Sequence, residues 1–540
     1  MVLYTCSTRT ITVFARSYPN KVTYMETTVL RKVVLYFNPS ALLLTGLFAC
    51  SKLKIATETT DRNERALYVA VDGNDANNGT INAPFGTINY ALSKASAGDT
   101  VFVRAGTYTN RVIFGKSGLL GKPITLKAYP GERPLIDGSQ TTATGLMAMV
   151  SFPDVKFLTI EGFDIAHFQT QNPGVDPMGI SITGNSRDID IRNCNIFDIK
   201  NFHLTNRSAH AIFVLGNGSE VMRDINITGC TVHDTQTGTS ENVTFAGNVD
   251  GFTFTHNKIY DTENIGVIVA GGDNLHPTGD IRTNYARNGV VSDNEVYQVS
   301  MTKSTNYWGL NNYGAIGIYV CGGAGTIIER NTVYNCDRGI GLVSESNQLA
   351  TKTCIVRNNF VYNCNRTGIY LGDYLNYTTG GTQDCYVVNN TLFQNNKFLG
   401  HFGEIEGEIR LTERCTNNVI RNNIIYARPT DVFIHKYTAT GSGNIIDNNL
   451  YFTNGAPKWI WDGTAYSDYN VWKTASAQDA HSSSGVDPML VSISQPDLRI
   501  QPGSSARNSG TLTSEAVNGK TDIDNKPRTD NGKISKGAQQ

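Results

Sequence analysis

The chain has 540 residues, and its 46 basic and 47 acidic side chains nearly cancel. A net charge of −1 argues against a nucleic-acid-binding protein, because a phosphate backbone requires a basic surface. Only 17% of the residues are charged, and 52 glycines accompany many Asn, Thr and Tyr. These residues form helices poorly and suit strands and turns, so the composition favours a β-rich protein.

The first 50 residues resemble an export segment. Arg31 and Lys32 precede an apolar run that ends in small residues before Cys50, which is the order of a secretory signal. The run ending at Cys50 also resembles bacterial lipoprotein signals, which implies lipidation of Cys50; a buried apolar helix is the alternative. Met1 and Met25 are both candidates for the first residue of the translated protein. No later apolar run is long enough to span a bilayer, so we expect a secreted, periplasmic or surface-anchored protein with a linker at 51–66.

Residues 67–140 predict a cap and the first coils of a repeat. Three β-type runs, at 67–71, 100–103 and 124–129, are separated by Gly and Pro. Between the first two, the apolar residues of 87–95 recur at helical spacing, which predicts a short capping helix. Repeat proteins need such atypical terminal units because an open end exposes the core.

From about residue 155 one motif recurs, in which an apolar strand leads to Asn and then to an aromatic residue. The repeated asparagines are Asn257, Asn294, Asn331, Asn359, Asn390, Asn423 and Asn449. A second short strand follows each copy, and the interval between copies varies from 26 to 37 residues. A constant motif at irregular intervals indicates loops of variable length on a constant coil. We therefore predict an all-β parallel β-helix of roughly ten or more coils at 141–475, with a C-terminal capping segment at 476–540.

Stacked coils predict ladders of like side chains. The asparagines should hydrogen-bond to one another, and the aromatic residues should stack. The aromatic positions are Phe197, His233, Tyr260, Tyr297, Tyr334, Tyr362, Phe393 and Tyr426. We expect both ladders in the core, with a structural role. The cysteines should be mostly free thiols, because in-register stacking does not favour disulfide geometry.

Four stretches carry a family resemblance. YVAVDGNDANNGTINAPFGTINYALSKASAGDTVFVRAGTY (68–108) and KPITLKAYPGERPLIDGS (122–139) resemble the opening of secreted bacterial right-handed parallel β-helix proteins, including the family-nine pectate lyases. The stretch 497–510, with TDIDNKPR at 521–528, resembles their C-terminal segment. The resemblance implies a right-handed coil and a carbohydrate substrate. It says less about the reaction, because one fold hosts many chemistries.

Candidate catalytic residues lie on the second strand of each coil. Counting along these strands places Glu345, Asp373 and Glu413 in three consecutive coils, about 5 to 8 Å apart, with Arg410 on the same sheet. As a pair, such carboxylates could act as acid and base or nucleophile. As a group they could bind Ca²⁺, the one cofactor that we expect. Calcium or Arg410 would then neutralise a uronate for β-elimination. The alternative is that these residues are solvated acids at strand ends without a functional role.

Long insertions at 273–288, 302–314, 373–384 and 397–408 are rich in aromatic residues, His and Asn. Long insertions in a compact repeat are usually functional, although loop packing is the alternative. The side chains that could bind sugar are Tyr319, Tyr370, Trp308, Tyr307, Tyr374 and His276. Weaker candidates are His210, Glu241 and Asp250.

One departure from the resemblance concerns the catalytic residues. The family-nine enzymes hold calcium with adjacent aspartates and use a lysine base, but this sequence has no Asp-Asp pair, and no motif supports Lys258 or Lys303. Only fold and substrate class therefore carry over. We expect a monomeric polysaccharide lyase that acts on an extracellular uronate-containing, pectin-like chain. A glycoside hydrolase with paired carboxylates and a non-catalytic glycan-binding protein or adhesin are the alternatives.

Overall fold

The computed structural model describes residues 2–6, 9–13, 64–273, 275–374, 376–398 and 404–540. The chain divides into two compact units, Met1–Arg62 and Asn63–Gln540. In the first, β1 (Val2–Cys6) and β2 (Arg9–Val13) pair antiparallel. Cys50 and most of the predicted export segment lie outside the described residues. Among the described residues, no helix is both long and apolar enough to cross a membrane.

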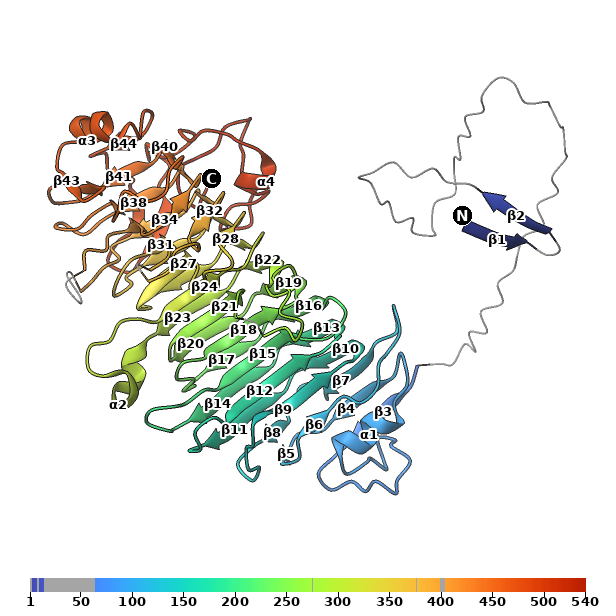
Figure 1. The fold of residues 1–540 in the computed structure, drawn as a ribbon. Helices are drawn as coiled ribbons and strands as arrows, with labels where there is room; N and C mark the ends of the chain where they lie inside the picture. The colour runs from blue at the N-terminus through green and yellow to red at the C-terminus, as the bar shows by residue number, and fades with distance from the viewer. Residues whose placement is uncertain (1, 7–8, 14–63, 274, 375, 399–403) are drawn as a thin grey trace, which may run out of the picture. The chain divides into compact units, whose positions relative to one another are not determined.

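The second unit is a right-handed parallel β-helix, as predicted. Its coils stack along one axis and form three sheets of 13 strands each (Figure 1). The first sheet contains β3 (Ala66–Val69), β4 (Thr100–Val103), β7 (Ile124–Ala128), β10 (Lys156–Glu161), β13 (Arg187–Arg192), β16 (Arg223–Thr228), β19 (Asp250–Thr255), β22 (Arg287–Ser292), β25 (Ile327–Glu329), β29 (Ile355–Arg357), β33 (Tyr386–Val388), β37 (Val419–Arg421) and β40 (Ile445–Asp447).

The second sheet contains β5 (Thr107–Tyr108), β8 (Leu135–Asp137), β11 (Asp164–Thr170), β14 (Asn195–Asn201), β17 (Thr231–His233), β20 (Lys258–Thr262), β23 (Glu295–Val299), β26 (Thr332–Tyr334), β30 (Phe360–Tyr362), β34 (Thr391–Phe393), β38 (Ile424–Tyr426), β41 (Leu450–Phe452) and β44 (Ser483–Ser484). The third contains β6 (Val112–Ile113), β9 (Leu146–Pro153), β12 (Asp176–Thr183), β15 (His210–Gly216), β18 (Glu241–Gly247), β21 (Ile265–Ala270), β24 (Ile316–Cys321), β27 (Arg338–Val343), β31 (Ile369–Gly372), β35 (Ile409–Leu411), β39 (Ile434–Lys436), β42 (Trp459–Trp461) and β43 (Thr464–Tyr466).

Smaller elements complete the unit. A three-stranded sheet is formed by β28 (Thr351–Lys352), β32 (Thr382–Gln383) and β36 (Cys415–Thr416), and a pair by β45 (Leu490–Ser492) and β46 (Asp497–Ile500). The helices are α1 (Ile88–Lys94), η1 (Met301–Ser304), α2 (Thr305–Trp308), α3 (Tyr469–Ser476) and α4 (Glu515–Asn518). The predicted capping helix is α1, which begins after Thr87, whose side chain accepts a hydrogen bond from the Tyr90 backbone.

The asparagine ladder is confirmed and lies in the buried interior. From Asn257 to Asn449, each backbone N–H donates to the Oδ1 of the next ladder asparagine over 2.8 to 3.1 Å. The side-chain amides donate in turn to backbone carbonyls such as that of Val291. The eight cysteines of the second unit are buried free thiols.

The aromatic ladder, by contrast, lies on the outer face of the second sheet, and our expectation of a core position was wrong. From Phe197 to Tyr362 the rings are half-buried and stack with centroids 4.9 to 5.2 Å apart. Strand alternation explains this position, because inward Val333 is fully buried and the next residue, Tyr334, must point out. Further along, Phe393 and Tyr426 are buried under the C-terminal segment.

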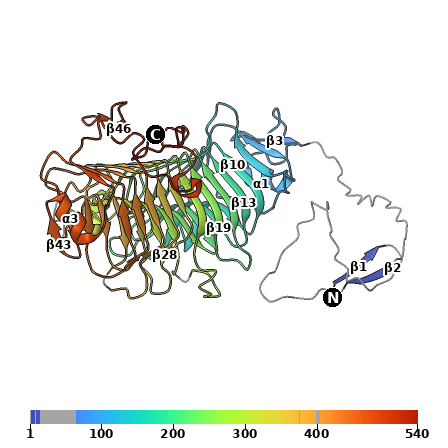
Figure 2. The same ribbon diagram turned by 90° about the horizontal axis from the view of Figure 1, so that it is seen from above.

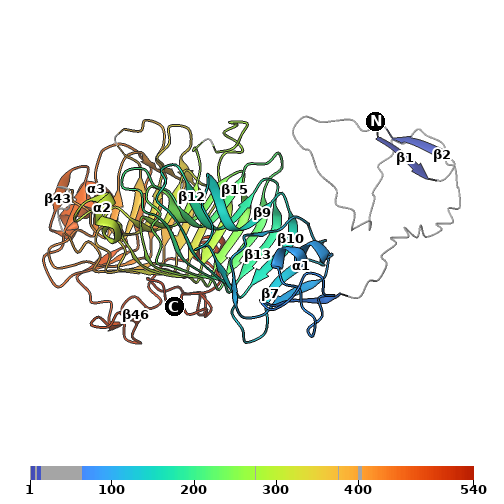
Figure 3. The same ribbon diagram turned by 90° about the horizontal axis from the view of Figure 1, so that it is seen from below.

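That C-terminal segment runs back along the outside of the coils (Figure 2). The Arg357 guanidinium donates to the Ala516 carbonyl over 2.7 Å, and the Asn525 amide donates to Asp293 over 3.3 Å. Seen from the opposite side, β46 lies outside the stacked coils (Figure 3). The segment thereby covers one part of the surface and leaves the outer face of the third sheet to other loops.

Candidate functional site

The outer face of the third sheet carries its own hydrophobic cluster, separate from the coil interior. The strand register aligns Phe213, Thr244, Ile268 and Tyr319 in one row across β15, β18, β21 and β24. Trp308, the last residue of α2, stands beside this row. Together they enclose a cavity of about 700 Å³ with an apolar floor.

Four carboxylates line this cavity, which we call the acidic groove: those of Asp176, Glu241, Asp273 and Glu345. Asp176 and Glu241 are the first residues of β12 and β18. Asp273 and Glu345 lie shortly after the ends of β21 and β27. The carboxylates therefore approach from the two opposite edges of the sheet, with the apolar row between them.

The environments of these acids change their protonation. Burial, followed by repulsion from Asp273, raises the pKa of Glu241 to about 7. Partial desolvation by the groove walls, followed by the charge of Glu345, raises the pKa of Asp273 to about 6, even though this residue is solvent-exposed. Burial lowers the pKa of His210 to about 4, so this imidazole is neutral at pH 7.

Hydroxyl groups orient the two glutamates. The Thr244 hydroxyl donates to Glu241 Oε2 over 3.2 Å, and Thr244 Oγ1 lies 3.1 Å from His210 Nδ1. On the other edge, the Tyr319 hydroxyl donates to Glu345 Oε1 over 2.7 Å. The Glu345 backbone N–H donates to Cys321 Sγ over 3.3 Å. Each glutamate is therefore held by a neutral donor.

A second cavity of about 350 Å³ adjoins the groove and shares Arg338 and Tyr374 with it. Asp373 and Glu413 line this second cavity, whereas Glu345 lines the acidic groove. Asp373 is bound by Arg414 through two hydrogen bonds of 2.6 and 2.8 Å. The three carboxylates on which the sequence prediction depended therefore do not gather in one cavity.

The ends of the strands explain this separation. Val343 pairs with Gly372, so Asp373 directly follows the last paired residue and Glu345 lies one position further on. Both residues therefore lie in loops beyond the sheet, and these loops lead to different cavities. The described residues also contain no group of three or more His, Cys, Asp or Glu side chains placed to hold a metal ion. Calcium at Glu345, Asp373 and Glu413 stays a prediction without geometric support.

Arginines surround a buried glutamate beside the second cavity. Arg410 Nη1 lies 2.8 Å from both Glu404 and Glu406, and Arg366 also contacts these two carboxylates. Arg338 lies 3.5 Å from Glu406. Burial alone would raise the pKa of Glu406, but the three arginines hold it at about 2. Arg410 is thus tied into an ion-pair network at the wall of the cavity.

The predicted sugar-binding residues divide into two groups. Tyr319 and Trp308 line the acidic groove, Tyr370 lines the second cavity, and Tyr374 lines both. Tyr307 and His276 line neither of these cavities. The Tyr307 ring instead packs 4.1 Å from the guanidinium carbon of Arg207, and His276 is buried with Nε2 2.8 Å from the Gly218 carbonyl. The Trp308 indole donates to buried Glu263 over 2.5 Å, which fixes the groove wall.

Sequence reasoning missed Asp176 and Asp273 and ranked Glu241 low. Glu241 is the first residue of a second strand, as His210 is in the preceding coil. This alignment could have identified Glu241 from the sequence. Asp273 begins the predicted insertion 273–288, but nothing in the sequence pairs it with Glu345 across 72 positions. The two lysines nearest the predicted site are engaged elsewhere, since Lys258 pairs with Glu295 and Lys303 with Asp261.

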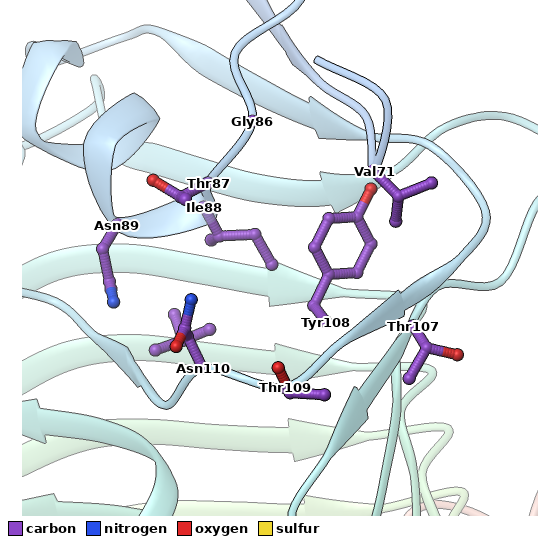
Figure 4. Close-up of a pocket in the computed structure, with 10 residues that line it drawn as sticks. Val71, Gly86, Thr87, Ile88, Asn89, Thr107, Tyr108, Thr109 and Asn110 are labelled. Atoms are coloured by element: carbon purple, nitrogen blue, oxygen red, sulfur yellow. The ribbon is translucent and has the colours of Figure 1, made fainter. Parts of the chain in front are cut away.

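A separate cavity of about 190 Å³ lies beside the N-terminal capping helix (Figure 4). Its lining combines Val71 and Ile88 with polar side chains such as Asn89, Asn110 and the Tyr108 phenol. Among the described residues that line it there is no carboxylate, imidazole, lysine or arginine, so this lining lacks the acid and base groups that the acidic groove provides.

Comparison with known proteins is consistent with this architecture. Residues 67–265 match the family model described as a Pel9A-like, right handed beta helix region, and residues 241–391 match the model of a right handed beta helix region. The chain is 34% identical to the uncharacterized protein YwoF of Bacillus subtilis over 473 residues, which covers 86% of this chain and 98% of that protein.

Two further proteins are similar to part of this chain. Pectate lyase PEL9 of Emericella nidulans is 42% identical over 80 residues, which are 14% of this chain and 20% of that protein. Among solved structures, the GH136 lacto-N-biosidase of Eubacterium ramulus is 15% identical with a TM-score of 0.47, over 71% of this chain and 67% of that one.

Proposed function

Because the chain belongs to the pectate-lyase-like right-handed β-helix proteins, we propose that it is a carbohydrate-active enzyme whose acidic groove hydrolyses glycosidic bonds. The observation that carries the proposal is the pair Glu241 and Glu345, which face one groove from opposite sheet edges in different environments. Most glycoside hydrolases use two carboxyl groups that flank the bond to be cleaved.

The two glutamates take different roles. With a pKa of about 7, Glu241 keeps a proton in a large fraction of molecules at neutral pH, so it acts as the general acid that protonates the leaving oxygen. Glu345, held by the Tyr319 hydroxyl, acts as the base that activates water or as the nucleophile. The apolar floor and Trp308 provide the surface against which a sugar ring packs.

The residues of the groove favour hydrolysis over the β-elimination that the sequence led us to expect. Elimination needs a base beside the sugar and a cation that neutralises the uronate carboxylate. No lysine is among the described residues that line the groove or the adjoining cavity. Arg338 faces the groove but already neighbours Glu406 at 3.5 Å.

A polysaccharide and oligosaccharide panel tests the assignment. We expect new reducing ends without the ultraviolet absorbance of an unsaturated product, and a loss of about 10²- to 10⁴-fold in Glu241→Gln. The matched control is Glu413→Gln, which should keep near-normal turnover. Glu413 lies in the adjoining cavity, where its carboxylate accepts a hydrogen bond from the Thr440 hydroxyl. Unsaturated product would identify a lyase instead. Binding without turnover of any substrate would identify a glycan-binding protein.

We also propose that the protein is exported and anchored through Cys50. The support is the order of Arg31, Lys32, the apolar run and Cys50 in the sequence. Fractionation of cells that express the full chain should place it in the membrane fraction, and Cys50→Ser should release it. A protein that stays in the cytoplasm would contradict export.

A further inference from the structure

The acidic groove has more negative charge than its own cations balance. The charged and titratable groups that face it are the carboxylates of Asp176, Glu241, Asp273 and Glu345, the Arg338 guanidinium, the neutral His210 imidazole, the Cys321 thiol and the phenols of Tyr319 and Tyr374. Within the described part of the chain, none of the four carboxylates forms an ion pair. Their hydrogen-bond donors include the uncharged hydroxyls of Thr244 and Tyr319.

The nearby arginines are committed to other acids. Arg338 neighbours Glu406, Arg410 binds Glu404 and Glu406, and Arg414 holds Asp373. Each of these contacts lies on the side of the adjoining cavity. A hydroxyl donor solvates a carboxylate but does not cancel its charge, so the groove is left with a negative potential that a ligand can complement.

We propose that the acidic groove selects a sugar that carries a protonated amine, such as a hexosamine with a free amino group, and rejects uronates. This inference deepens the proposed function and rests on it. An ammonium group offers three hydrogen-bond donors and a positive charge, which suits carboxylates that approach from two sheet edges. The aromatic rings of Trp308 and Tyr319 in the lining add a surface that attracts a cation.

A uronate would meet the opposite conditions. Its carboxylate would enter a groove in which Asp273 and Glu345 already repel each other, as the raised pKa of Asp273 indicates. Like charges brought together oppose binding. A metal ion is the other cation that could balance the groove, so the experiment must distinguish an amine from a metal.

Binding of monosaccharides to the full-length chain tests this inference. Glucosamine, N-acetylglucosamine, glucose and glucuronate share one ring and differ in charge, and as free monosaccharides they contain no bond to hydrolyse. Titration at pH 7 and low ionic strength should give glucosamine an affinity at least about tenfold above that of N-acetylglucosamine, with glucuronate the weakest. The result does not depend on turnover. The amine preference can therefore be absent while hydrolysis is observed, and it can be present while no hydrolysis is observed.

Two variants connect the preference to the groove. Asp273→Asn removes one charge from the groove while the Glu241 and Glu345 side chains stay in place, and should reduce the preference for the amine by about threefold or more. Asp250→Asn removes a charge from the first sheet, where Asp250 pairs with Arg287, and should leave the preference unchanged. Equal binding of glucosamine and N-acetylglucosamine, tighter binding of glucuronate, or an unchanged preference in Asp273→Asn would overturn the inference. Calcium binding that Asp273→Asn abolishes would also overturn it, because a metal would then neutralise the groove.

Discussion

Replacing one ladder asparagine tests how the coil interior is stabilised. Asn331 donates to the Val291 carbonyl and to Asn359 Oδ1 over 2.9 and 3.0 Å, and it accepts from the backbone and side chain of Asn294 over 3.0 and 2.9 Å. Asn331→Ala removes all four bonds from a fully buried site. The Asn294 N–H then loses its partner inside the coil.

The expected loss follows from these contacts. A typical intramolecular hydrogen bond contributes about 1 kcal/mol net, and an orphaned buried group costs about 1–3 kcal/mol, so Asn331→Ala should lower the free energy of unfolding by about 3–5 kcal/mol. Urea titration should show an earlier midpoint at unchanged slope. Thr332→Ala, on the neighbouring outward position, is the control and should stay within about 0.5 kcal/mol of the parent. A loss below about 1 kcal/mol in Asn331→Ala would refute the view that the ladder stabilises the coil.

Three further predictions concern protonation and the groove wall. If Glu241 is the general acid, activity should fall as pH rises through about 7, because the folded-state proton is then lost; a rate that stays constant to pH 9 would exclude this role. Burial raises the pKa of Asp479 to about 6, so its contribution to stability is present at low pH and lost as pH rises from about 4 to 6, by at most about 3 kcal/mol. Asp479→Asn should remove that part of the pH dependence in urea titrations, and an unchanged profile would contradict it. Trp308→Phe should raise KM more than it lowers kcat, because it removes the indole that lines the groove and that Glu263 orients, and equal effects on both would argue against this binding role.

Sequence periodicity predicted the coil because the coil interior repeats. The asparagine ladder, the capping helix and the second strands could all be predicted, since each depends on a short local pattern of residue types. The same rule of alternation places Tyr334 outside the coil next to inward Val333, so the position of the aromatic ladder was also predictable in principle. We did not foresee a second cause of the asparagine excess. Residues just before the ladder asparagines, such as Asn358, Asn389 and Asn422, adopt positive φ values of 56 to 57°, which Asn tolerates better than most residues.

The site could not be predicted to the same degree, because it depends on strand register and on loops of unequal length. Aligning Asp373 with Glu345 across a one-residue offset predicted a carboxylate cluster, but the two side chains line different cavities. Asp273 enters the groove from the start of an insertion, where no repeat constrains its position. Position along a β-helix follows from the repeating motif, whereas the partners of a side chain at the rim follow from the loops.

The separation of coil and groove leads to a last prediction about stability. The asparagine ladder lies inside the coil, whereas Glu241 and Asp273 lie outside it on a face where their charges repel. Removing either charge should therefore leave the urea midpoint unchanged or raise it, while it impairs catalysis or ligand binding. Such a gain is typical of residues kept for function at some cost in stability. Glu241→Gln and Asp273→Asn can be compared with Asp250→Asn, which breaks an ion pair with Arg287 and should gain nothing. A clear loss of stability in both groove variants would show that these acids stabilise the fold, and the argument for a charge-unbalanced functional groove would then fail.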